Sequence, residues 1–264
     1  MLQPFGTKKP IIAMAHLGPL PGAPGHDRQG GMQKLIDDVA ADIESLEAAG
    51  VDAIMFGNEG DRPYVLQAPP EGLAAMAAVV ASLKPSIHVP LGVNYLWDPV
   101  ATVALAVATG ALFAREIFTG VYASDMGFWQ PRCAEALRLR DNLGRPDLKL
   151  LFNINAEFAA PLDTRPAALK AKSAVFSSKA DIICVSGPLT GQALDQSELR
   201  SVKAAVPDTP VFANTGVNID NVTDILAVAD GVVIGSHFKK DGNTWNAVDP
   251  ARAARFMDRV RQLR

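Results

Sequence analysis

The sequence predicts a closed (β/α)8 barrel, and three observations indicate this fold class. Eight short apolar runs alternate with longer segments of helical spacing along the whole chain. Eight strand–helix units are the number at which a parallel sheet closes on itself with its helices outside. The 264 residues also fit the length of about 250 residues that such a barrel commonly occupies. The alternative is an open doubly wound sheet, which the lack of a dinucleotide-binding glycine motif disfavours.

The eight apolar runs are the expected strands. Each run is apolar almost throughout, which is typical of a parallel sheet whose two faces are both covered. An exposed antiparallel strand would instead alternate polar and apolar residues. The runs span residues 10–17, 51–58, 88–95, 111–117, 148–155, 180–186, 210–216 and 231–238.

The segments between the runs have the spacing of helices. Residues 32–49 place an aliphatic stripe on one face, and the last segment, from about residue 249, repeats apolar side chains at the same period. Gly50, Gly110 and Gly231 stand where three helices give way to strands, and glycine is the usual residue just past a helix end. No Ser-rich or charged linker interrupts the chain, so we expect one domain over residues 1–264.

Composition and charge exclude several classes of function. The chain has 28 acidic and 25 basic residues and a net charge of −3, whereas a nucleic-acid-binding protein normally carries a basic excess. Its longest uncharged stretch, residues 99–114, is too short for a membrane span. The two cysteines lie far apart in sequence and form no metal or redox motif. We therefore expect a cytoplasmic protein with reduced thiols, no nucleic-acid partner and no membrane insertion.

Polar residues gather where the predicted strands end, and this is the face on which barrel enzymes carry their active sites. The candidate catalytic residues there are Glu59, Glu157 and His16, with His237 as a further histidine. A carboxyl group in a partly dry site can exchange protons near neutral pH. Glu59, Glu157 and His16 could equally hold one divalent metal, although no ligand-spacing motif supports a cofactor. His16 could also be a core histidine with its hydrogen bonds satisfied.

The candidate substrate-binding residues are amides and cations on the same face. Asn153, Asn155 and Glu157 share one parity, so a continuous strand would place them on one side. Arg115 lies within an apolar strand, either paired with a barrel carboxylate or free to bind a substrate anion. The full set comprises Asn58, Asn94, Arg115, Asn153, Asn155, Asn214 and Lys239.

The candidate phosphate-binding residues lie chiefly in the last quarter of the chain. Loops after the seventh and eighth strands, with glycine permitting close backbone approach, commonly bind phosphate in barrel enzymes. A helix is expected to begin near residue 219, directly after the seventh-strand loop. The glycines could alternatively serve only tight turns. The set is Gly187, Thr215, Gly216, Gly235 and Ser236.

Several segments together resemble the BtpA family, nearly from end to end and in order. They are residues 12–22, 58–64, 92–94, 113–115, 185–191, 230–235 and 239–242. The resemblance implies a TIM barrel of the phosphate-binding type. The family includes a factor linked to photosystem I accumulation and the SgcQ-like proteins found beside sugar-uptake and sugar-phosphate genes.

The residues at the ends of the predicted strands differ from those of the photosystem branch and are more similar to those of the SgcQ-like branch. Glu59 stands two places beyond the position of the glutamate in that branch, Glu157 replaces a lysine, and Asn214 begins a different turn. We therefore expect an enzyme acting on a phosphorylated sugar or polyol, of the isomerase, epimerase, aldolase (lyase) or hydrolase type. The alternative is a non-catalytic assembly or regulatory factor of the photosystem I biogenesis kind. Either function is compatible with a homo-oligomer.

Overall fold

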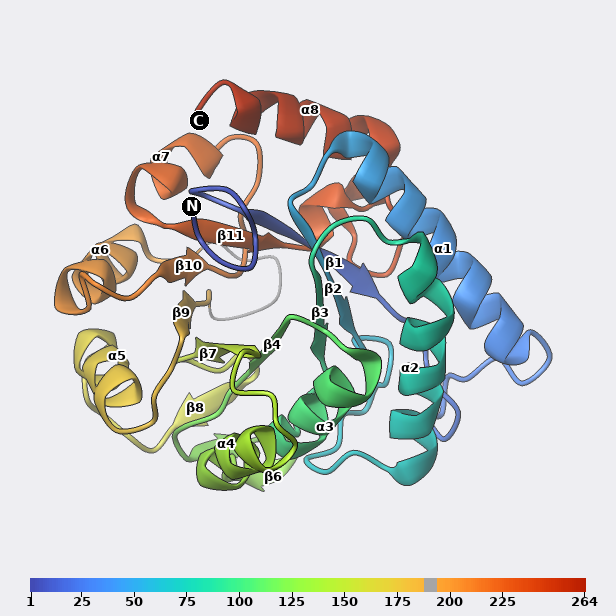
Figure 1. Cartoon of the computed structure of the whole chain (residues 1–264), viewed down its shortest axis with the longest axis horizontal. Helices are drawn as coiled ribbons and strands as arrows, with labels where there is room; N and C mark the ends of the chain where they lie inside the picture. The colour runs from blue at the N-terminus through green and yellow to red at the C-terminus, as the bar shows by residue number, and fades with distance from the viewer. Residues whose placement is uncertain (188–193) are drawn as a thin grey trace.

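A computed structural model describes residues 1–187 and 194–264 of the chain. Within these residues, eight parallel strands close into a barrel in the order β1-β11-β10-β9-β7-β4-β3-β2 (Figure 1), so the predicted fold class is confirmed. The barrel strands are β1 (Ile11–His16), β2 (Ala53–Gly57), β3 (Leu91–Asn94), β4 (Phe113–Glu116), β7 (Lys149–Asn153), β9 (Ile182–Val185), β10 (Val211–Ala213) and β11 (Gly231–Ile234).

In residues 1–187 and 194–264, eight α-helices form a ring around the barrel (Figure 1). Leu35, Val39, Ile43 and Leu46 of α1 are buried, as their helical spacing predicts. The helices are α1 (Gly31–Ala49), α2 (Pro70–Leu83), α3 (Pro99–Thr109), α4 (Cys133–Asn142), α5 (Ala167–Phe176), α6 (Gln196–Ala205), α7 (Val222–Val228) and α8 (Pro250–Arg261). None of the helices in the described part of the chain is long and apolar enough to cross a membrane.

The apolar side chains inside the barrel form one cluster, and those between the barrel and the helices form another. In β1, Ile12 and Met14 point inward, while Ile11, Ala13 and Ala15 pack against the outer helices. The alternation follows from the period of two in a strand.

Phe5, from the N-terminal segment, also lies in the interior cluster. Its ring centroid lies 5.1 Å from that of Phe113 and 5.9 Å from that of Phe212. Gly92 makes room for Phe113, because a Cβ there would lie 2.1 Å from that ring. The interior is therefore packed with side chains below the mouth.

The loops after β4 and β7 form a small sheet that the sequence did not predict. Three antiparallel strands, β5 (Tyr122–Ser124), β6 (Gly127–Trp129) and β8 (Ala159–Pro161), pair in the order β6-β5-β8. Strands of three residues are too short to show a reliable period. Tyr122 and Trp129 pack with Trp97 in an aromatic cluster beside the barrel mouth.

Several barrel strands end earlier than the apolar runs suggested. β7 ends at Asn153 rather than at 155, and β11 ends at Ile234 and is followed by a 3-10 turn, Ser236–Phe238. Beyond the end of β7, the Asn155 side chain accepts a hydrogen bond from Ser186 N at 2.9 Å and donates one to Ser186 O. The Asn155 side chain thus bonds to the backbone of Ser186 in place of the backbone hydrogen bonds that a longer β7 would make.

Candidate functional site

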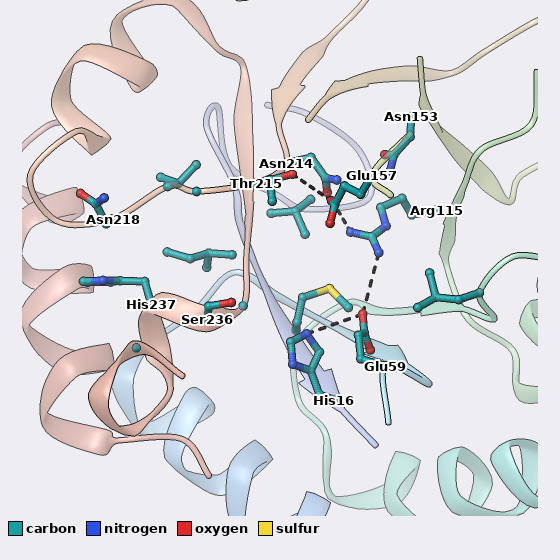
Figure 2. Close-up of a pocket in the computed structure, with 18 of the residues that line it drawn as sticks. His16, Glu59, Arg115, Asn153, Glu157, Asn214, Thr215, Asn218, Ser236 and His237 are labelled. Carbon is teal, nitrogen blue, oxygen red and sulfur yellow. Dashed lines mark hydrogen bonds and ion pairs between the residues drawn. The ribbon is translucent and has the colours of Figure 1, made fainter. Parts of the chain in front are cut away.

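A pocket of about 240 Å³ opens at the carboxyl ends of the barrel strands (Figure 2). Figure 2 shows side chains from many strands and loops converging there. The predicted site residues that line it are His16, Glu59, Arg115, Asn153, Glu157, Asn214, Thr215, Gly216, Gly235 and Ser236. Residues far apart in sequence therefore meet where the fold predicted them to meet.

Strand parity explains why four of these side chains point into the barrel. His16, Arg115, Asn153 and Asn214 each stand two residues after an interior apolar residue, namely Met14, Phe113, Leu151 and Phe212. Because successive side chains alternate between faces, each polar group continues the inward row of its strand. The apolar interior therefore changes to a polar layer at one level of the barrel.

Arg115 is the central cation of this polar layer. Its Nη1 donates a hydrogen bond to Asn214 Oδ1 at 2.8 Å, and its Nε and Nη2 donate to Asn94 Oδ1, the Nε bond being 3.2 Å long. The closest carboxylate oxygen in its ion pairs, Glu59 Oε1, lies 4.0 Å from Nη2. Arg115 is thus held by neutral amides, with its charge only partly compensated by a carboxylate.

Glu59 and His16 lie side by side next to this guanidinium. His16 Nε2 is 3.6 Å from Glu59 Oε1, and each side chain keeps only about a tenth of its surface exposed, 10% for His16 and 11% for Glu59. Burial, with the charges of Lys239 and Arg115, lowers the pKa of His16 to about 3, so the imidazole is neutral. Burial raises the pKa of the Glu59 carboxyl, although the charge of Arg115 opposes that shift.

Glu157 reaches the pocket from the loop after β7, beyond the end of the strand. It accepts a hydrogen bond from Thr215 Oγ1 at 3.0 Å. Asn153 Oδ1 is buried and has no hydrogen-bond partner among residues 1–187 and 194–264. Since a buried unpaired acceptor is costly, Asn153 is suited to receive a hydroxyl of a bound molecule.

The three predicted metal ligands do not fit a metal. Glu59, Glu157 and His16 do not come together as a ligand group, and no such group of three occurs in the part of the chain that the structure describes. The Arg115 guanidinium lies 4.0 Å from Glu59, where it would repel a divalent cation. We therefore assign no step to a metal.

The predicted phosphate loops border the other end of the pocket. Gly216, Gly235 and Ser236 line it, and Figure 2 places Ser236, Asn218 and His237 on the side away from Arg115. Gly187 is not part of the described lining, and residues 188–191 of the same loop lie outside the described residues. Gly235 also packs against His16, because a Cβ there would lie 2.9 Å from the imidazole.

The helix after β10 begins later than predicted, at Val222 rather than near residue 219. Asn218 Oδ1 accepts hydrogen bonds from the backbone N–H groups of Asp220 and Asn221, at 2.9 and 3.2 Å. These N–H groups are therefore already bonded and do not face an anion. Any phosphate here depends on the loops and on nearby cations instead.

Lys239 lies outside the pocket lining, contrary to the placement expected from the sequence. It is 2% exposed, and its Nζ donates a hydrogen bond to Asp42 of α1, which is 6% exposed. β11 ends at Ile234, and the turn that follows directs Lys239 into the protein rather than toward the mouth.

Three predicted amides also support the site without lining it. Asn58 accepts a hydrogen bond from Leu96 N at 2.7 Å and thereby joins the loops after β2 and β3. Asn94 binds Arg115 and donates to Glu116 Oε1 at 2.9 Å. Asn155 binds the backbone of Ser186. The parity argument fails for Asn155 because β7 has already ended at Asn153.

Arg252 is a pocket residue that the sequence reasoning missed. It lies in the first turn of α8, and its Nε donates a hydrogen bond to His237 O at 2.9 Å. Asp249, the N-cap, and Pro250 mark this helix start in the sequence. A cation is unusual in a first turn, where the helix dipole disfavours it, and that signal could have identified it.

Aromatic residues near the mouth complete the lining. Trp97 lines the pocket, and Tyr64 lies edge-on to it with ring centroids 5.7 Å apart. The Tyr64 hydroxyl donates a hydrogen bond to Glu59 O at 3.0 Å. The Tyr64 side chain therefore holds the backbone of Glu59 and also lines the pocket.

We expect Glu116, behind Arg115, to make stability depend on pH. Burial raises its pKa to about 8, compared with 4.5 in the unfolded chain, so the folded state keeps a proton that the unfolded state releases. The Glu116 contribution to the free energy of unfolding should therefore fall as pH rises from about 4.5 through about 8, and above pH 6.5 the low pKa values of His16 and His237 no longer oppose it. Chemical denaturation at a series of pH values measures the slope. Glu116→Gln should flatten it, and an unchanged slope in that variant would contradict the assignment.

The fold and the pocket define a (β/α)8-barrel protein with a polar pocket at the carboxyl ends of its strands. The chain belongs to the BtpA family, whose sequence model matches residues 7–262.

Two curated relatives show where the chain stands within that family. It is 48% identical to the putative sgc region protein SgcQ of Escherichia coli over 260 residues, covering 98% of this chain and 97% of the relative. It is 32% identical to the photosystem I biogenesis protein BtpA of Synechocystis sp. over 262 residues, covering 98% and 90%. The predicted similarity to the SgcQ-like branch is confirmed.

A solved structure with little sequence similarity has the same fold. Phosphoribosyl anthranilate isomerase from Thermus thermophilus is 14% identical and aligns with a TM-score of 0.57 over 97% of this chain and 100% of that chain. This likeness is one of fold.

Proposed function

We propose that the chain is an enzyme that acts on a phosphorylated sugar or polyol. The observation that carries the proposal is that the two ends of one pocket differ in chemistry. Glu59, His16 and Arg115 lie at one end, and the loops after β10 and β11 with Arg252 lie at the other. A small molecule with an anion at one end and hydroxyl or carbonyl groups at the other matches both.

Arg252 is the cation best placed to bind the phosphate. Its Nε is held by a backbone carbonyl, and its Nη2 lies 3.4 Å from His237 Nδ1. Burial and the charge of Arg252 lower the pKa of His237 to about 4, so this neighbour is neutral. A guanidinium fixed by neutral groups keeps its charge available for a phosphate oxygen.

We expect inorganic phosphate and sugar phosphates to raise the melting temperature. A ligand at 100 times its dissociation constant stabilises the fold by about 2.7 kcal/mol. Arg252→Gln should weaken phosphate binding by about 1.5–3 kcal/mol, roughly 10- to 100-fold, because a charged hydrogen bond is lost. Titration calorimetry or thermal shift measures the change.

Arg259→Gln is the matched control, because Arg259 lies on the same helix but is exposed and bonded to Thr223. Its phosphate affinity should equal that of the wild type. No response of the wild-type protein to phosphate or to any sugar phosphate would contradict the proposed function. If Arg252→Gln binds phosphate as tightly as the wild type, Arg252 does not bind the phosphate, but the proposed function still stands.

The second candidate is a non-catalytic assembly factor, as the name of the Synechocystis relative suggests for that protein. Two apolar residues of α5 favour an interaction role, since Leu169 and Phe176 are 49% and 91% exposed and stand seven residues apart on one helix face. A scaffold role requires no ligand in the pocket, so the phosphate titration distinguishes the two candidates.

A further inference from the structure

The end of the pocket around Arg115 points to one reaction class. We infer that Glu59, His16 and Arg115 catalyse proton transfer at a carbon next to the carbonyl of a ketose or aldose phosphate, through an enediolate. The inference rests on the proposed function and selects among its reaction types.

Arg115 is arranged to stabilise negative charge that develops during a reaction. Its hydrogen bonds go to the side-chain oxygens of Asn94 and Asn214, which carry no net charge. Arg115 is 8% exposed, and these hydrogen bonds fix its guanidinium without a bound ligand. A preorganised donor in a dry site stabilises an oxyanion more strongly than water does.

His16 supplies a second, neutral group at the same place. Because burial and neighbouring cations hold its pKa at about 3, the imidazole stays uncharged at physiological pH. A neutral imidazole can donate a hydrogen bond to a carbonyl oxygen without bringing a competing charge. Glycine at position 235 lets the ring lie close to β11.

Glu59 is the group placed to move the proton. Its Oε1 lies within 4.0 Å of both His16 and Arg115. Burial raises the pKa of this carboxyl group, which makes its carboxylate a stronger base. Glycine at position 57 is needed for this geometry, because a Cβ there would lie 2.4 Å from Glu59 Oε2. The carboxyl group is therefore held beside both oxyanion donors.

The lining argues against a route through an imine. Among the described residues that line the pocket there is no lysine, and residues 188–193 contain none in the sequence. The buried Lys239 is paired with Asp42. A carbonyl in this pocket must therefore be polarised by hydrogen-bond donors.

The phosphate position that we propose argues against hydrolysis of the phosphate. Ser236 and His237 lie across the pocket from Glu59 and Arg115 (Figure 2). A phosphate bound at the loops after β10 and β11 would thus hold the substrate, while the chemistry takes place at the other end. Binding energy from a remote group is a common means of orienting a reacting carbon.

The step balances without a further reactant. The Glu59 carboxylate takes the proton from the carbon next to the carbonyl, and the C–H electron pair becomes the C=C bond. The carbonyl π pair moves to its oxygen, whose negative charge faces Arg115 and His16. Return of the proton to the same carbon gives exchange or epimerisation, and its return to the former carbonyl carbon, with proton transfer between the oxygens, gives isomerisation.

Deuterium exchange tests the inference without knowledge of the net reaction. The full chain is incubated in D2O with dihydroxyacetone phosphate, ribulose 5-phosphate, xylulose 5-phosphate and fructose 6-phosphate, and proton NMR follows the C–H groups next to the carbonyl. We expect deuterium to enter the compounds that raise the melting temperature, faster than in buffer alone. Glu59→Gln should slow exchange about 10²- to 10⁴-fold while keeping the phosphate-dependent thermal shift.

Glu135→Gln is the matched control, since the Glu135 side chain is 61% exposed on α4, and it should exchange at the wild-type rate. Glu59→Asp, which keeps a carboxylate, should retain part of the rate and serves if the Gln variant does not fold. If no sugar phosphate that stabilises the protein exchanges, the inference is wrong and the proposed function stands. If neither inorganic phosphate nor any of the sugar phosphates stabilises the protein, both fail. Exchange at the wild-type rate in folded Glu59→Gln would remove Glu59 from the step.

Discussion

Lys239→Met is expected to lower the free energy of unfolding by about 3–5 kcal/mol while leaving phosphate affinity unchanged. Lys239 and Asp42 are 2% and 6% exposed and bind each other, so the variant leaves a buried carboxylate without its cation. Asp42 Oδ1 also accepts a hydrogen bond from Val248 N at 2.6 Å. Chemical denaturation gives the stability, and phosphate titration gives the affinity.

Two further variants make this experiment specific. Lys240→Met changes the exposed neighbouring lysine and should alter stability by no more than about 0.5 kcal/mol. Adding Asp42→Asn to Lys239→Met should recover part of the loss, because the unpaired charge is removed while an acceptor for Val248 N remains. A stable Lys239→Met variant that no longer binds phosphate would restore the ligand role expected from the sequence.

Arg115→Lys is expected to slow deuterium exchange roughly 10²- to 10³-fold and to leave the phosphate-dependent thermal shift unchanged. A lysine keeps the charge but lacks the planar fork that binds Asn94 and Asn214 together. The charge would then no longer be fixed where the oxyanion forms. The phosphate end of the pocket lies apart from this change (Figure 2).

Arg138→Lys is the control for this second experiment, because Arg138 is exposed on α4 and bonds only a backbone carbonyl in the described structure. It should exchange at the wild-type rate and melt at the wild-type temperature. Wild-type exchange in Arg115→Lys would show that the fork is not needed. If Arg115→Lys lowers both the melting temperature and the exchange rate, Arg115 has a structural role instead. Phosphate titration of the folded fraction then shows whether the folded variant still binds phosphate.

The inward side chains of the barrel mouth were predictable because strand parity is a local property. His16, Arg115, Asn153 and Asn214 follow interior apolar residues at a spacing of two, and all four line the pocket. The same rule fails for Asn155, which lies two residues past the end of its strand, whereas Asn214 lies only one residue past the end of β10 and still points inward. Asn155 lies beyond the last residue of β7 and binds Ser186 instead.

The placement of two cations was not predicted correctly from the sequence. Lys239 and Arg252 both lie near the end of the chain. The first-turn position of Arg252 is a local signal, but no local signal shows that Lys239 faces away from the pocket. Lys239 is buried against Asp42, which lies 197 residues away, whereas Arg252 bonds His237 and lines the pocket. The direction of each side chain depends on the turns after β11 and on its contact with α1.

The sequence by itself determined the barrel, its family, the eight strand regions and most of the side chains at the mouth. These follow from the period of apolar residues and from the rule that parallel strands present their carboxyl ends on one face. Only the tertiary structure decided where strands end, that Glu59 lies beside Arg115 and His16, and that Arg252 rather than Lys239 borders the pocket. The physical reason is that apolar burial follows a local pattern, whereas a polar group takes its position and its pKa from partners that the fold brings close from distant parts of the chain.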